Sequence, residues 1–134
     1  MDDEDRDVRA AAIRHPNVTK EHIDKALNDE DSDVRMSAQT NPNVGDLHLH
    51  KMIEDKEDYV RYSVLKHHKI NRSHIDHALK HHDWWMRVNG LRHHSATKRD
   101  YEHYLSDPHP MVREEAKYHL KNLENSGKTQ ENCS

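Results

Sequence analysis

The sequence is poor in residues on which many small sites and cores depend. It contains one cysteine, Cys133, and no phenylalanine among its 134 residues. A single cysteine excludes an internal disulfide framework, a cysteine-rich zinc site and an iron–sulfur cluster whose ligands are cysteines of one chain. No apolar run is long enough to span a bilayer or to act as a secretory signal. We therefore expect a cytoplasmic protein without membrane contact.

Large aliphatic side chains are also scarce. Leu, Ile and Val together supply 22 residues, whereas Asp, Glu, Lys and Arg make up 34% of the chain. That composition alone leans towards disorder. The apolar residues nevertheless recur at regular intervals, and a stack of small units needs less core than a globule of the same length. The chain is therefore expected to fold.

A repeat of 26 residues runs through the chain. Asp-Val-Arg at 7–9 recurs at 33–35, and a triplet that ends in arginine follows at each further interval. The arginines of this ladder are Arg9, Arg35, Arg61, Arg87 and Arg113. A fixed period of this length is the signature of a repeat architecture.

Each repeat predicts two short helices joined by a turn. In the second repeat, the first helix is expected over 31–40, the turn over 41–44 and the second helix over 46–54. The second helix places apolar residues at i, i+3 and i+4, as Leu49, Met52 and Ile53. Two helices joined by so short a turn are antiparallel neighbours. The pattern predicts an all-α protein, an α-solenoid of about four and a half repeats over residues 1–123.

The two ends of the array differ from its middle. In the first repeat, Val8, Ala11 and Ala12 are expected to face inward. The fifth repeat supplies only one helix, expected to run from Met111 to Leu123 and to cap the array with a polar outer face. Residues 124–134 are polar and are expected to form a disordered tail.

The second repeat resembles short helical repeats of known families. The resemblance is carried by Asp31, Val34, Arg35, Ala38, the turn Asn41-Pro42-Asn43-Val44, Leu49 and Ile53. These residues are similar to HEAT-like repeats, and more closely to the variant leucine-rich repeat, over residues 5–123. The resemblance leaves open a 3₁₀ helix in each repeat. HEAT-like relatives include protein-binding scaffolds, DNA-base glycosylases and phycobilin lyases, so the fold does not select a function.

The ladder arginines follow acids at a constant distance. The four pairs are Asp5 and Arg9, Asp31 and Arg35, Glu57 and Arg61, and Asp83 and Arg87. An acid four residues before an arginine stabilises a helix, and acids are also favoured at helix N-termini. We interpret these pairs as a structural ladder, with phosphate or carboxylate binding as the alternative.

Histidine is unusually frequent, with 15 residues. One repeat position holds His15, His67, His93 and His119, and another holds His22, His48 and His74. We expect the helix-end histidines to bond to turn carbonyls. The spacing of His74, His77 and His81 makes them weak metal-ligand candidates. No acid completes a known metal motif with them, so no metal or cofactor is predicted.

Charge and aromatic residues single out the second half. Residues 1–60 carry a net charge of −8 and residues 61–134 one of +4, with 11 of the histidines. Within it, Trp85 is expected to pack between repeats and Trp84 to be exposed. The candidate binding residues are Trp84, His81, His82, Arg87, Arg92, His93, His94, Lys98 and Arg99.

These features favour a non-catalytic module that binds another macromolecule. The leading hypothesis is a protein partner, bound through the concave face or through the basic, histidine-rich half. The alternative is nucleic acid, bound by residues 61–105 through phosphate contacts and tryptophan stacking. No nucleophile elbow, phosphate loop or metalloprotease motif is present, and we expect no enzyme activity.

Overall fold

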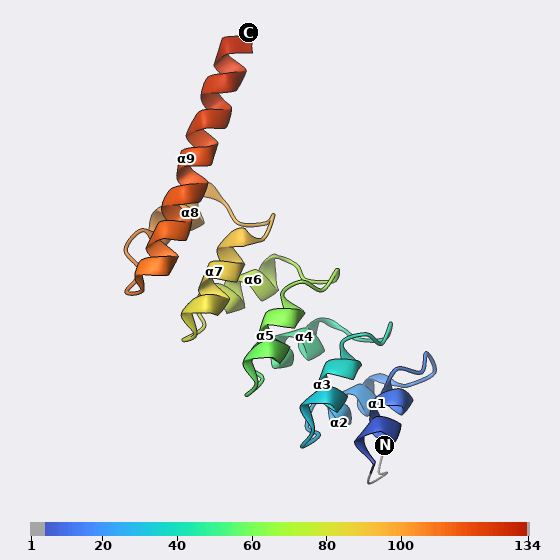
Figure 1. The fold of residues 1–134 in the computed structure, drawn as a ribbon. Coiled ribbons are helices and arrows are strands. Elements are labelled where there is room, and N and C mark those ends of the chain that lie inside the picture. The colour runs from blue at the N-terminus through green and yellow to red at the C-terminus, as the bar shows by residue number, and fades with distance from the viewer. Residues whose placement is uncertain (1–4, 134) are drawn as a thin grey trace. The chain divides into compact units, whose positions relative to one another are not determined.

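The computed structural model describes residues 5–133, with side chains as far as Ser126. This part of the chain contains nine α-helices and no strand, which confirms the all-α prediction (Figure 1). The helices are α1 (Arg6–Ile13), α2 (Lys20–Ala26), α3 (Ser32–Ala38), α4 (Asp46–Ile53), α5 (Asp58–Val64), α6 (Arg72–Leu79), α7 (Trp84–Arg92), α8 (Lys98–Tyr104) and α9 (Pro110–Cys133). The chain forms two compact units, residues 1–74 and 75–134, which divide within α6.

Polar caps set where most of the helices begin. Asp31 accepts the backbone N–H of Asp33 at 2.8 Å before α3. Thr19 accepts the N–H of His22 at 3.3 Å before α2. Such caps satisfy N–H groups that have no partner inside the helix. Both helices of each complete repeat are α-helical throughout the described residues, so the 3₁₀ helix that the resemblance leaves open is not found.

In the first unit, the first helices of successive repeats pack on one another. α1 contacts α3, α3 contacts α5, and α2 lies against both α1 and α3. The core between them contains fully buried residues at the positions expected from the repeat: Ile23, Val34, Leu49, Met52, Ile53, Val60 and Val64. The period of 26 residues is therefore also the period of the packing.

In the second unit, α7 and α8 both pack against the first part of α9. Met86, Leu91, Val112 and Ala116 are buried there. Gly90 lies against α6, and a Cβ atom at this position would be 2.9 Å from Cδ2 of Leu79. A larger residue at position 90 would therefore have to displace the side chain of Leu79.

In the first repeat, two residues that were expected to face inward are exposed instead. Val8 is 50% exposed and Ala11 is exposed, whereas Ala10 and Ile13 are buried. In later repeats, the equivalent residues Val34, Val60, Met86 and Val112 are buried. No described element precedes α1, so its corresponding face stays in solvent.

The last helix is longer than the sequence predicts. α9 runs to Cys133 and does not end near Leu123. In the complete repeats, the residue equivalent to Leu123 is an N-cap or begins a new helix: Thr19, Gly45, Asn71 and Thr97. Leucine cannot cap a helix, and no proline lies in this part of α9 to stop it. The end of the repeat domain at residue 123 stays a prediction.

The described residues contain no candidate membrane-spanning helix. None of their helices is both long enough and apolar enough to cross a bilayer.

Candidate functional site

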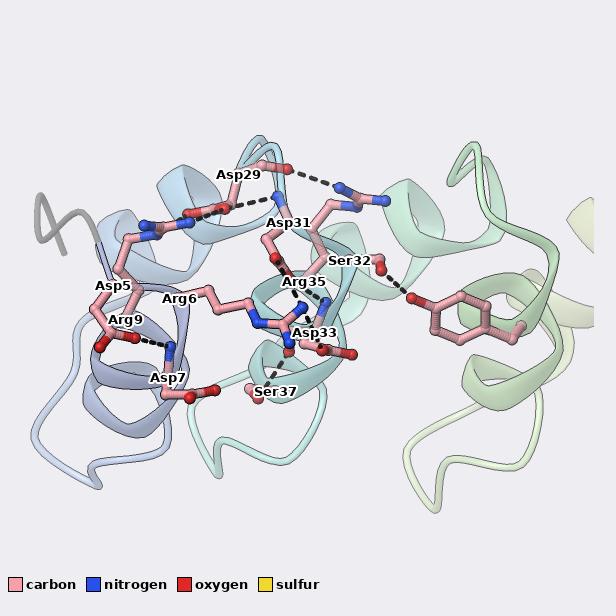
Figure 2. A network of polar contacts seen from close by, with 11 residues as sticks. Asp5, Arg6, Asp7, Arg9, Asp29, Asp31, Ser32, Asp33, Arg35 and Ser37 are labelled. Atoms are coloured by element: carbon pink, nitrogen blue, oxygen red, sulfur yellow. Dashed lines mark hydrogen bonds and ion pairs between the residues drawn. The ribbon is translucent and has the colours of Figure 1, made fainter.

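Three of the five ladder arginines, Arg9, Arg35 and Arg87, are held by aspartates that follow the second helix of the same repeat. Arg9 donates from Nε and Nη2 to the two carboxylate oxygens of Asp29, at 2.9 and 3.1 Å. Arg35 makes the same bidentate contact with Asp55, at 2.8 and 3.2 Å. Figure 2 shows the guanidinium groups of Arg9 and Arg35 in this network. Each pair ties the first helix of its repeat to the segment after the second helix.

The remaining guanidinium nitrogen reaches back to the preceding repeat. Nη1 of Arg35 donates to the backbone oxygen of Asp29 at 2.8 Å. Nη1 of Arg61 donates in the same way to the backbone oxygen of Asp55 at 2.8 Å. One aspartate therefore accepts an arginine of its own repeat and an arginine of the next.

The second unit repeats this arrangement. Arg87 pairs with Asp107 through Nε and Nη2 at 2.8 and 2.9 Å, and its Nη1 donates to the backbone oxygen of His81 at 2.9 Å. Nη1 of Arg113 donates to the backbone oxygen of Asp107 at 2.7 Å. The bidentate pair is thus present in each repeat that has an aspartate 20 residues after its ladder arginine.

Three of the acids that lie four residues before the arginines, Asp5, Asp31 and Asp83, cap their helices, whereas Glu57 makes no such cap. Asp31 caps α3 and lies 3.6 Å from Nη1 of Arg6, while the guanidinium of Arg35 is occupied by Asp55 and Asp29. The predicted pair of Asp31 and Arg35 is therefore wrong. The reason is geometric, because an N-cap carboxylate turns towards the backbone N–H groups of the first turn. Asp5 and Asp83 cap their helices in the same manner.

The aspartates that hold the arginines are not among the residues predicted from the sequence. Asp29, Asp55 and Asp107 occupy one repeat position, and His81 stands at this position in the third repeat. These aspartates recur at the same interval of 26 residues as the arginines, and this shared period is the signal that could have identified them. Each aspartate lies 20 residues after its arginine in the sequence, as Asp29 does after Arg9. Side-chain pairs within a helix are three or four residues apart, so no helix pattern indicates this pairing.

These ion pairs change the acidity of their carboxylates. Burial alone would raise the pKa of Asp29, but the hydrogen bonds from Arg9 and from the N–H of Asp31 outweigh it, so the pKa lies below the ordinary value. The pKa of Asp107 is lowered in the same way, because the Arg87 and His109 contacts overcome its burial. Both carboxylates are therefore ionised at neutral pH.

Histidines cap the second helices from their third residue. The ring Nδ1 accepts the backbone N–H three residues earlier, from Thr19 to His22 at 3.2 Å, from Gly45 to His48 at 2.9 Å and from Asn71 to His74 at 3.0 Å. This is the role that glutamate takes in a capping box. An accepting Nδ1 leaves the proton of the neutral ring on Nε2.

That Nε2 atom connects successive second helices. In His48 it lies 3.1 Å from Oδ1 of Asp24 on α2. In His74, which is fully buried, it lies 3.1 Å from the backbone oxygen of Asp46 at the start of α4. Both ring nitrogens of these histidines are therefore used by the repeat itself.

The histidines at the end of the first helices stabilise the turns. Nδ1 of His67 accepts the N–H of Lys69 at 3.1 Å, and its Nε2 bonds to the backbone oxygen of Gln39 at 2.9 Å. This contact confirms the expected bond to a turn carbonyl for His67 alone among the four histidines at this position. Asn41 does the same work in the second repeat, accepting from Asn43 at 2.8 Å and donating to the backbone oxygen of Ile13 at 2.6 Å.

Two of these turn histidines have lowered basicity. Burial lowers the pKa of His67, and the neighbouring charges of His68 and Lys69 lower it further. The bond to the backbone oxygen of Gln39 raises this pKa but does not outweigh the other effects. Burial also lowers the pKa of His93, helped by His94. Their neutral forms are thus favoured in the folded chain.

The weak metal candidates do not form a metal centre. Within the described residues, no group of three or more His, Cys, Asp or Glu side chains is placed to hold a metal ion. His74 is engaged as described above, and Nδ1 of His81 accepts the N–H of Asp83 at 3.0 Å. His81 also stacks on His82, with ring centroids 4.4 Å apart.

The tryptophans are both half-buried. Trp84 was expected to be exposed, but the ring of His109 stacks on it at 4.1 Å and nearly parallel, which covers one of its faces. Trp85 lies at an edge-on angle to Trp84, with Arg92 5.1 Å from its ring centroid. The stacking face proposed for a nucleobase is therefore partly occupied by the protein.

The basic candidates include both paired and exposed residues. Arg87 is paired with Asp107, and Arg92 donates to Glu115 at 2.9 Å. The exposed candidates are His82, Arg92, His94, Lys98 and Arg99, so the ion pair of Arg92 with Glu115 lies at the surface. Of the two arginines, only Arg87 makes its ion pair below the surface.

An apolar groove that the sequence analysis did not identify lies between α8 and α9. It is open to solvent and has a volume of about 1060 Å³. Its apolar lining consists of Ala96, Tyr101, Leu105, Leu120 and Leu123, and its charged lining consists of Lys98, Lys117, Lys121 and Glu124. The signal in the sequence was the missing cap at Leu123, which leaves the fifth repeat without a second helix.

No protein-family model, curated protein or solved structure matches this chain. Its helices pack pairwise in sequence order, which is consistent with a helical repeat.

Proposed function

We propose that this chain is a non-catalytic protein-binding module and that the contact lies in its second unit, residues 75–134. The observation that supports this most strongly is the apolar groove between α8 and α9. Leu123 is 45% exposed at its edge, and an apolar surface of this kind in water is typical of an interaction site. The contact would lie in the histidine-rich half, one of the two surfaces that the sequence suggests.

The proposal includes an α-solenoid of the HEAT-like or variant leucine-rich type. It is supported by bonds that recur from repeat to repeat, such as Arg35 and Arg61 reaching the repeat before them. Repeats that contact chiefly their neighbours are the defining feature of a solenoid.

The histidines support a non-catalytic role. A general base needs a free nitrogen near its substrate. In His48, His67 and His74, Nδ1 accepts a backbone N–H, and Nε2 faces an oxygen of the preceding repeat. These rings are structural groups in the repeat.

Nucleic-acid binding by residues 61–105 is a second candidate with less support. The exposed Lys98 and Arg99 favour it, but the guanidinium groups of Arg87 and Arg92 are already neutralised by carboxylates. Binding to single-stranded oligonucleotides at low salt, lost on Trp84→Ala, would favour this candidate over a protein partner.

The proposed function is tested by capture from the lysate of the source cells. The full chain should retain a stoichiometric protein, identified by mass spectrometry, and Leu123→Lys should lose it. Tyr118→Lys is the matched control, because Tyr118 lies on the same helix, is 61% exposed and does not line the groove. Equal capture by wild type and Leu123→Lys, or no capture at all, would contradict the proposal.

A further inference from the structure

We propose that the groove between α8 and α9 is an acceptor site for a short, acidic amphipathic helix of another protein. This helix would take the place of the second helix that the fifth repeat lacks. The inference rests on the proposed function and adds to it the chemistry of the partner.

The chain itself shows what normally fills the corresponding place. In each complete repeat, a second helix of seven or eight residues follows the first. It buries apolar residues at i, i+3 and i+4, as Leu49, Met52 and Ile53 do in α4. Successive second helices are also bonded together, for example by His48 to Asp24 and, in the second unit, by the hydroxyl of Tyr104 to the backbone oxygen of Leu79 at 2.7 Å.

The fifth repeat has the receiving surface without that helix. Tyr101, Leu105 and Leu120 line the groove with Leu123. Leu105 and Leu120 are only half-buried, as is Leu27 at the position equivalent to Leu105 in the first repeat. The equivalent residues of the second and third repeats, Ile53 and Leu79, are buried. The apolar lining is thus incompletely covered where the next second helix would lie.

The chain's own C-terminal residues do not suit the vacant place. Residues 124–134 contain one apolar side chain, Cys133, and so lack the i, i+3, i+4 pattern. The backbone of α9 also continues straight as helix through residues 124–133, without the turn that folding back would require (Figure 1). Residues 124–133 therefore do not supply the second helix of the fifth repeat, and the groove is open to a helix from another protein.

Charge selects an acidic partner. Three lysines, Lys98, Lys117 and Lys121, line the groove with one acid, Glu124. Lys117 lies 3.3 Å from Glu114, but both are exposed, and such a pair is weak enough to be replaced by a partner's carboxylate. Lysines around an apolar floor favour a helix whose apolar stripe is flanked by Asp and Glu.

The test uses fluorescent, helix-stapled peptides and the full-length protein. One peptide copies the apolar spacing of residues 46–53 and carries glutamate at the other positions, and its matched control carries lysine there. Stapling is needed because so short a helix is marginal in water. Anisotropy should show binding of the acidic peptide that weakens as salt rises, and binding of the lysine peptide at least about tenfold weaker.

Variants locate the binding on the protein. Leu123→Lys and Lys121→Glu should each lower the affinity for the acidic peptide by about tenfold or more, whereas Tyr118→Lys should leave this affinity unchanged. All four proteins should give the same circular dichroism melting curve, since these side chains are exposed. Equal binding of both peptides, or binding that survives Leu123→Lys, would overturn the inference.

Competition separates this inference from the proposed function. If the captured partner depends on Leu123 but the acidic peptide does not displace it, the protein-binding function holds and the acidic-helix inference fails. If sedimentation shows a dimer that Leu123→Lys abolishes, the occupant is a second copy of this chain, which also overturns the inference.

Discussion

At the scale of single residues, the ladder arginines owe their burial to partners that lie far away in sequence. Arg35 is 3% exposed, and its guanidinium bonds to Asp55 and to the backbone of Asp29. A buried guanidinium is tolerated only when its donors are satisfied. The acid four residues before it, Asp31, serves the backbone of α3 instead.

Replacing Asp55 by alanine should therefore cost more stability than replacing Asp31. Asp55→Ala leaves the buried charge of Arg35 without its carboxylate, which should cost about 3 kcal/mol. Asp31→Ala removes a helix cap, which costs about 1 kcal/mol. Urea unfolding of both variants measures the difference, and the reverse order would support pairing at i, i+4.

The turn histidines should make stability depend on pH. The pKa of His67 is lowered in the folded chain, so the unfolded chain takes up a proton at higher pH than the folded one. The stabilisation is present above the unfolded pKa of about 6.5 and is lost as pH falls from there towards the folded pKa. Burial acts on His93 in the same direction.

His67→Asn should reduce this pH dependence. Asn41 shows that asparagine can accept from the turn and donate to the preceding repeat at this position. Urea midpoints at about pH 7.5 and about pH 5.5 should differ less in the variant than in wild type. An unchanged difference would mean that His67 does not contribute.

At the scale of helices, the period of 26 residues and the capping residues were enough to predict eight short helices and their buried faces. Val34, Leu49 and Val60 are buried as expected. The pattern did not predict the exposure of Val8, because that depends on a neighbouring repeat. The pattern also did not predict the length of α9, because the residues after Leu123 lack the apolar stripe from which a helix is predicted.

The contact between α6 and α7 should be sensitive to side-chain size. The third repeat carries Val64 at the position of Gly90. Gly90→Val should nevertheless destabilise the protein by roughly 1–3 kcal/mol, because even a Cβ atom would lie 2.9 Å from Leu79. Val64→Ala is the matched change in the opposite sense and should cost stability by leaving a cavity. A more stable Gly90→Val variant would contradict the close packing.

At the scale of the molecule, the residues that repeat build the fold, and the place where the repeat stops offers the candidate site. The arginines and histidines singled out by their frequency are mostly engaged in holding repeats together. The groove was hidden from sequence reasoning because Tyr101, Leu105 and Leu120 read as ordinary core residues. Only their packing in the second unit shows that Leu105 and Leu120 are incompletely covered, whereas Tyr101 is buried.

Hydrogen exchange of the complex with the captured partner tests the central claim most directly. Binding in the groove should slow amide exchange in residues 97–105 and 117–124, because a docked helix lowers local opening there. Residues 5–60 of the first unit should exchange as in the free protein and serve as the internal control. Protection confined to residues 5–60, with none around the groove, would contradict the account.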